Sequence, residues 1–272
     1  MSNNMKYTIP IAIVLVLGGL AGGVYYWRTH QPAPVNEAPV MPVAPPPPVP
    51  APIKPPAPPV HFPVPKPTVP AKAPLPSLDK SDAAMTQLLT DFFGRGSVEE
   101  LFVPRDIIHR FVVLVDSLPH RKLPMRFRLF RPVAGKFLVS GPKDSRALSP
   151  ENYRRYTPYV LMAQAVSSKT LVATYVRFYP LLQQEYKRLG YPHGYFNDRV
   201  VAAIDNMLAT PDVKAPLDLV RPNVLYQFAD PKLEALSAGQ KILLRMGPEN
   251  AARIKAKLRE IRNDLTGQVS KP

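Results

Sequence analysis

The residues most capable of chemistry gather in one short stretch, GYPHGYFNDR, at residues 190–199. Its ten positions hold three aromatic rings, an imidazole, an Asn-Asp pair and a guanidinium. Side chains of these types stack on ligands, donate hydrogen bonds and pair with anions. The stretch is therefore the first candidate for a binding site.

Helix ends explain part of the same stretch. Gly190 can end a helix with a positive φ, Asn197 can cap the next helix, and Asp198 suits its first turn. A buried corner between two helices also explains the remaining side chains. That corner is our first interpretation, and the second is a polar binding site formed by Tyr191, His193, Tyr195, Asp198, Arg199 and Arg177.

No motif for a metal, a cofactor or covalent catalysis is present. The chain has no cysteine, and no two of its five histidines have the HxxxH spacing of a zinc site. It also has no G-x-S-x-G nucleophile elbow. The sequence therefore predicts no cofactor, no metal ligand and no catalytic residue. A hydrolase or transferase with two dispersed carboxylates stays open as the alternative, with Glu151, Glu185 or Asp198 as candidate acids.

The elements that would position these residues are mostly helices. Apolar spacing and cap residues predict helices over residues 79–93, 104–118, 150–166, 168–188, 198–208, 231–246 and 248–265. A capping box is predicted at residues 97–100. MRFRLFRP (125–132) and GKFLVSG (135–141) predict a small β-hairpin, and 224–228 predicts a strand. The expected fold is mostly α, with residues 77–266 as a helical globular domain.

Two features of the predicted helices bear on the site. One face of the 168–188 helix carries an apolar stripe, and we expect it to pack in the core. Its residues are Leu171, Tyr175, Phe178, Tyr179, Leu182 and Tyr186.

Asp116 lies in an apolar run, and Arg177 lies between Val176 and Phe178. If both charges are buried, they are expected to pair.

The amino-terminal region predicts a membrane anchor. Residues 7–27 carry no charge and are long enough to span a bilayer. Tyr25, Tyr26 and Trp27 suit the aromatic belt at an interface. A cleaved signal peptide is the competing interpretation. We predict a retained single-pass anchor, with residues 1–6 as a short cytoplasmic tail.

A proline-rich spacer follows the anchor. Residues 32–76 hold 20 of the 36 prolines, so neither helix nor sheet is expected there. We predict a disordered polyproline spacer over residues 28–76, with a reach on the order of 140 Å. Residues 267–272 are predicted to form a disordered tail.

Charge points to anionic partners. The net charge is +15, and five basic residues and one acidic residue precede Ser77, which leaves +11 on the globular region. Such an excess favours cell-wall polymers, anionic lipids or nucleic acid, although solubility explains it too. The predicted contributors are Arg154, Arg155, Lys187, Arg188, Lys255, Lys257 and Arg259.

Several stretches together resemble a known family. They are RPVAGKFLVSG (131–141), LSPENYRRYTPYV (148–160), YVRFYPLLQQEYKRLGYPHGYFNDRVVAAID (175–205) and FADPKLEALSAGQKILLRMGPENAARIKAKLREIR (228–262). The chain is similar to the domain of unknown function 3014 family of proteobacteria over residues 88–265. The resemblance implies an inner-membrane-anchored protein with an exported domain, and it implies no activity.

These inferences combine into one expectation of function. The chain is expected to be a single-pass inner-membrane protein with a cytoplasmic amino terminus and a periplasmic carboxy-terminal domain. That domain would bind a cell-wall polymer such as peptidoglycan, or an envelope protein. Nucleic acid fits the charge but not the predicted compartment.

Overall fold

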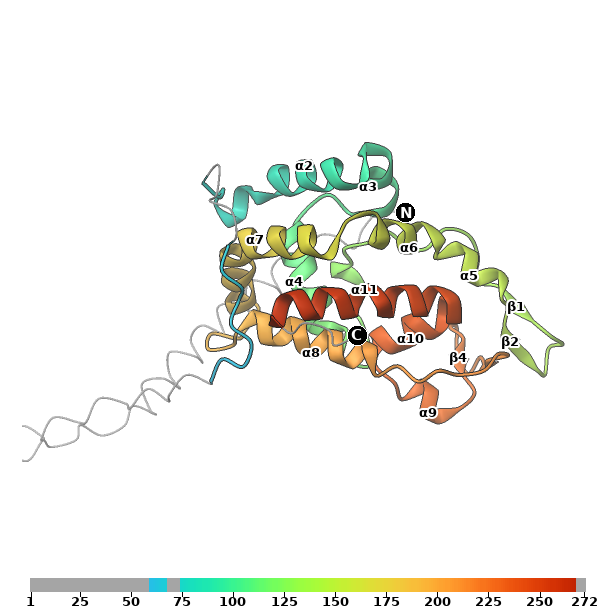
Figure 1. Ribbon diagram of the computed structural model, residues 1–272. Coiled ribbons are helices and arrows are strands. Elements are labelled where there is room, and N and C mark those ends of the chain that lie inside the picture. Colours follow the sequence, from blue (N-terminus) through green and yellow to red (C-terminus); the bar gives the residue numbers. More distant parts are fainter. Residues whose placement is uncertain (1–58, 68–73, 268–272) are drawn as a thin grey trace, which may run out of the picture. The chain divides into compact units, whose positions relative to one another are not determined.

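The computed structural model describes residues 59–67 and 74–267, which belong to one compact unit of residues 56–272 (Figure 1). The predicted cytoplasmic tail, the anchor at 7–27, most of the spacer and all but the first residue of the 267–272 tail lie outside the described residues. Within those residues, no helix is both long enough and apolar enough to cross a membrane.

The described chain is mostly helical with a small sheet, in agreement with the predicted class. Its first part contains η1 (Leu78–Lys80), α2 (Ser81–Phe93), α3 (Arg95–Leu101), α4 (Ile107–Ser117), η2 (Met125–Phe127), β1 (Val139–Ser140), β2 (Arg146–Leu148), α5 (Glu151–Arg155) and α6 (Thr157–Ala165). Its second part contains α7 (Ser168–Arg188), α8 (Phe196–Leu208), β3 (Asp218–Val220), β4 (Gln227–Phe228), α9 (Pro231–Glu234), α10 (Ala238–Arg245) and α11 (Pro248–Thr266).

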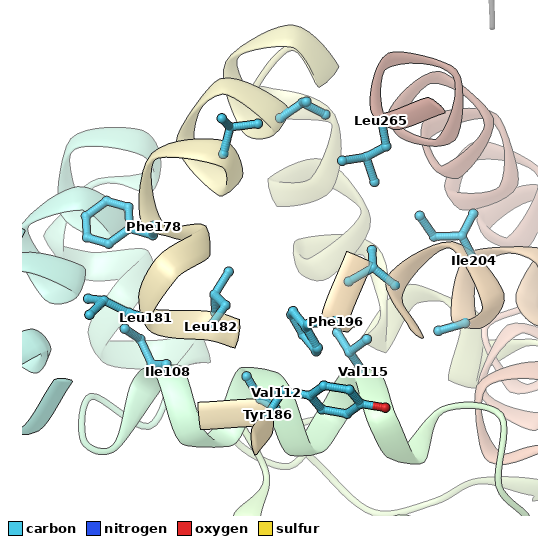
Figure 2. Packing of buried hydrophobic residues seen from close by; sticks show 14 residues of the cluster. Ile108, Val112, Val115, Phe178, Leu181, Leu182, Tyr186, Phe196, Ile204 and Leu265 are labelled. Atoms are coloured by element: carbon cyan, nitrogen blue, oxygen red, sulfur yellow. The ribbon is translucent and has the colours of Figure 1, made fainter. Parts of the chain in front are cut away.

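The main core lies between α4, α7, α8 and α11 (Figure 2). Each helix contributes apolar side chains that point into the shared space, because their apolar residues recur at helical spacing. Phe196, at the start of α8, is fully buried. The predicted stripe on α7 is confirmed as core packing, since Phe178, Leu182 and Tyr186 are buried and Tyr175 and Tyr179 pack against the same cluster.

The sheet differs from the predicted hairpin. Its four antiparallel strands have the order β1-β2-β3-β4, and Val139 pairs with Leu148. Residues 125–132 form no strand of it. The buried Arg110 explains this, because its guanidinium donates to the carbonyls of Arg126 and Arg128 at 3.2 and 3.0 Å. A side chain occupies the acceptors that a neighbouring strand would need.

Four helix predictions also needed correction. Residues 97–100 form no capping box, because α3 already begins at Arg95. The helix predicted from Pro104 begins at Ile107, where the Asp82 carboxylate accepts the backbone N–H groups of Asp106 and Ile107. Residues 150–166 form α5 and α6, and residues 231–246 form α9 and α10. The capping box occurs instead at Ser237 and Gln240, at the start of α10.

Candidate functional site

The corner between α7 and α8 is built around glycines. Gly190 follows the end of α7 with a φ of 116°, which favours glycine. A Cβ on Gly194 would lie 2.8 Å from the Tyr186 ring and 2.9 Å from the Tyr191 Cβ. The chain can therefore fold back tightly here, and residues 191–195 lie directly over the end of α7.

Gln183 fixes the shape of this corner from the side of α7. Its amide nitrogen donates to the Gly194 carbonyl at 2.8 Å. Its amide oxygen accepts from the Phe196 backbone N–H at 2.8 Å and from the Tyr179 hydroxyl at 2.7 Å. One side chain thus satisfies the backbone on both sides of Tyr195, and the start of α8 is held in place.

The corner holds the end of the proline-rich spacer. The two Asp198 carboxylate oxygens accept the backbone N–H groups of His61 and Phe62, at 3.1 and 2.7 Å. The Val64 N–H donates to the Tyr195 hydroxyl at 3.1 Å. Figure 1 shows this spacer segment, drawn in blue at the left, away from the sheet at the right. Two predicted site residues therefore bind main chain from the spacer.

Asn197 completes the contact. The structure corrects its expected role as a helix cap, because Tyr195 occupies the cap position and Asn197 lies inside α8. Its fully buried side chain donates to the Phe62 carbonyl at 2.8 Å and accepts from the Tyr175 hydroxyl at 3.0 Å. A buried amide must find partners for both its ends, and here one partner is the spacer.

Two other predicted residues tie the corner to α4. The Arg199 Nε lies 2.9 Å from an Asp116 carboxylate oxygen, and its guanidinium also donates to the Asp116 carbonyl. The Tyr191 hydroxyl donates to the second carboxylate oxygen at 3.3 Å, while its ring stacks on Tyr186 with centroids 4.5 Å apart. This half of the site is structural.

The predicted pairing of Asp116 with Arg177 is wrong. Arg177 is exposed on α7, with its guanidinium 5.5 Å from the Phe178 ring centroid. Sequence spacing could not show that Arg199, 83 residues away, reaches Asp116. His193 is exposed in the loop before α8. The structure thus brings Tyr191, Tyr195, Asp198 and Arg199 to one corner and leaves Arg177 and His193 on the surface.

Three tyrosine side chains at this corner, Tyr175, Tyr179 and Tyr191, have a raised pKa, and burial is the main cause. It raises the pKa of the Tyr175 phenol well above its ordinary value of 10.0, and nearby Tyr179, Tyr195 and Asp198 add to the effect. The pKa of Tyr179 rises for the same first reason. For Tyr191, burial and then the Asp116 carboxylate raise the pKa. These hydroxyls therefore serve as neutral hydrogen-bond donors, not as bases.

The candidate acids are separated from one another by their contacts. Glu185 is buried and lies 2.7 Å from the His109 ring nitrogen. Both Asp198 oxygens are occupied by the spacer, and Glu151 is exposed in the first turn of α5. Over residues 59–67 and 74–267, no three His, Cys, Asp or Glu side chains are placed to hold a metal ion.

Sequence reasoning missed three residues that build the corner. Tyr175 was expected only as core, Asn197 only as a cap, and Gln183 carried no signal. The pairing of residues 195–198 with residues 61–64 spans more than 130 positions. Local spacing contains no trace of a contact at that separation.

A second surface was also missed. Residues 121–143, named here the basic segment, contain no acidic residue. All their cationic side chains are exposed, and none pairs with a carboxylate among the described residues. They are Arg121, Lys122, Arg126, Arg128, Arg131, Lys136 and Lys143. A simple count of charge along the chain would have found this segment.

Comparison with known protein families places most of the described domain in one family. A family model described as "Protein of unknown function (DUF3014)" matches residues 107–262, from the start of α4 into α11. Comparison with curated proteins and with solved structures gave no match. The matched interval contains the α7–α8 corner, the basic segment and the sheet, and it covers more than half of the chain. The chain belongs to the DUF3014 family.

Proposed function

We propose that this chain is a membrane-anchored cell-envelope protein whose basic helical domain binds an anionic cell-wall polymer. Residues 7–27 anchor it in the inner membrane with the amino terminus in the cytoplasm. The domain lies in the periplasm at the far end of the spacer. The observation that carries the binding role is the exposed basic segment, residues 121–143, which has no acidic residue to offset its charge.

The basic segment has the properties of a surface for polyanions. Its backbone is held by other side chains: Arg110 binds the carbonyls of Arg126 and Arg128, while Arg155 binds those of Val133, Ala134 and Gly135. The exposed cations are thus mounted on a fixed loop. Single-sign charge of this kind concentrates an anionic partner at the surface.

The hydrolase alternative has no comparable support. The contacts of Glu185 and Asp198 already use their carboxylates inside the protein. Glu151 is exposed in the first turn of α5 and contacts no second carboxylate among the described residues. A binding role therefore fits the geometry better than an acid-base reaction.

The experiment is co-sedimentation with purified peptidoglycan sacculi, using the full chain in a mild nonionic detergent across a salt series. We expect Arg121→Glu/Arg126→Glu/Arg128→Glu to lower the binding constant by more than tenfold, at about 1 kcal/mol per basic residue near an anionic surface. The matched control Lys169→Glu/Arg177→Glu/Lys187→Glu reverses three exposed charges on α7. We expect it to bind like the wild type.

Two results would contradict the proposal. If the wild type does not sediment at low salt, the wall polymer is not the partner, and cross-linking would then seek an envelope protein. If both triple variants lose binding equally, net charge alone acts and the basic segment is not the site. The compartment is tested separately, by alkaline phosphatase fused to the carboxy terminus, which is active only when exported.

A further inference from the structure

We propose that Tyr195, Asn197 and Asp198 form a peptide-binding site for proline-interrupted segments, and that the chain's own residues 61–64 are its resident ligand. The site lies at the α7–α8 corner and is separate from the basic segment. The inference does not depend on the identity of any wall polymer.

The contacts recognise main chain. Within four consecutive residues, the site accepts three N–H groups and donates to one carbonyl. Proline has no N–H, so each donor must come from another residue type. The donors are His61, Phe62 and Val64, and the positions they leave out, Pro63 and Pro65, are both proline. The site therefore requires non-proline residues at the positions of His61, Phe62 and Val64, and it accepts proline at the positions of Pro63 and Pro65.

The side chains of Phe62 and Val64 further restrict which segments the site can bind. Val64 packs against the main core cluster, and Phe62 is half-buried. The same proline pattern recurs in the sequence at HQPAP (30–34) and KAPLP (72–76). Neither has an aromatic residue at the position of Phe62. Main-chain hydrogen bonds supply the common binding energy, and the apolar positions supply selectivity, as in other strand-like recognition.

The site is built from residues that other parts of the domain hold in place. Asn197 is fully buried and receives the Tyr175 hydroxyl. The Tyr195 ring packs on Tyr179 with centroids 5.7 Å apart. Asp198 lies in the first turn of α8, where the helix dipole favours its charge. If the spacer left, the buried Asn197 amide would lose a partner, and another extended segment would restore it.

The spacer has a large advantage as the ligand. A tethered segment has an effective concentration in the millimolar range, and its prolines lower the entropy lost on binding. Docking also shortens the part of the spacer that is free to extend. Release would free about 17 residues between residues 59 and 76, adding roughly 50 Å of reach if they extend.

The test is fluorescence anisotropy with a fluorescein-labelled peptide of residues 59–67 and the full chain in detergent. In the His61→Pro/Phe62→Pro chain, the resident segment loses the two N–H groups that the Asp198 carboxylate accepts. We expect the peptide to bind this variant and to bind the wild type at least about tenfold more weakly, because the occupied site is unavailable. Adding Asp198→Asn to the variant should abolish binding.

Several outcomes of the anisotropy experiment would overturn the proposal. A peptide that fails to bind the His61→Pro/Phe62→Pro chain, or that binds it no better than the wild type, overturns the proposal. Binding that survives Asp198→Asn, or that a peptide with proline at both positions reproduces, places the peptide elsewhere and overturns it too. Circular dichroism of each variant confirms that its helices are intact.

A second measurement needs no change at the contact. Because the chain has no cysteine, spin labels at Lys66→Cys and His193→Cys report the docked spacer alone. We expect a narrow distance distribution that broadens when unlabelled peptide is added above the effective concentration of the tethered segment. A distribution that is broad from the start, or that excess peptide leaves narrow, contradicts an exchangeable site.

Discussion

The pair of Asp116 and Arg199 offers the sharpest stability prediction. The two side chains are 12% and 22% exposed and lie 2.9 Å apart. Arg199→Ala would leave the carboxylate largely buried with only the Tyr191 hydroxyl beside it. Breaking one side of a buried pair costs about 3–5 kcal/mol. Because some water reaches this pair, we expect a loss of about 2–4 kcal/mol.

Substitution of the other partner, Asp116→Asn, should lower stability less. Asp116→Asn removes the negative charge but keeps an oxygen for the Arg199 Nε and the backbone carbonyl that the guanidinium also binds. We expect a loss of about 1–2 kcal/mol, in the range for a hydrogen bond to a charged group. The double variant should then lose about 1–3 kcal/mol less than the sum of the two, because both changes remove one interaction.

Urea unfolding of residues 56–272 measures these differences. For a domain of this size, each kcal/mol also lowers Tm by about 2–4 °C. The matched control is Arg188→Ala, which breaks an ion pair with Asp79 whose partners are 50% and 80% exposed. It should cost less than about 1 kcal/mol. Additive effects of Asp116→Asn and Arg199→Ala within about 0.5 kcal/mol would refute the coupling.

Three further predictions concern the framework. Gly247→Ala should lower stability by more than about 2 kcal/mol in urea unfolding, because φ is 85° there and a Cβ would lie 2.4 Å from the Tyr153 ring; a loss below about 0.5 kcal/mol would contradict this contact. Ser237→Ala should cost about 1 kcal/mol by removing the capping box at α10, and an unchanged urea midpoint would count against it. Burial raises the pKa of Tyr175 above 10.0, so its stabilising contribution is complete below pH 10 and is lost as the pH rises further. Wild-type stability should therefore fall by about 1.4 kcal/mol per pH unit more than that of Tyr175→Phe above pH 10, and equal slopes in alkaline urea titrations would rule this out.

Local signals predicted where helices occur better than where each one begins or ends. The Ser167 side chain caps α7, and the Asp230 side chain caps α9. Gly94 and Gly247 end or begin helices with positive φ. These features depend on a few neighbouring residues, so the sequence displays them directly. The same holds for the apolar stripe of α7, whose spacing alone predicted its burial.

Long-range contacts explain why other predictions, for residues 125–132, for the partner of Asp116 and for the spacer, differed from the structure. Residues 125–132 alternate like a strand, but Arg110 occupies their carbonyls. Arg177 was expected to pair with Asp116 if both were buried, but Arg177 is exposed and Arg199 pairs with Asp116. The spacer was expected to form neither helix nor sheet, because prolines remove backbone donors. Three of the N–H groups that the prolines leave, at residues 61, 62 and 64, are bound by the α7–α8 corner.

The central claim is that this corner holds the spacer by its main chain, and amide hydrogen exchange tests it most directly. We expect the His61, Phe62 and Val64 amides to exchange at least about tenfold more slowly than in an unstructured peptide. Asp198→Asn should remove the protection of His61 and Phe62. Exchange of all three wild-type amides at the unstructured rate would contradict the claim.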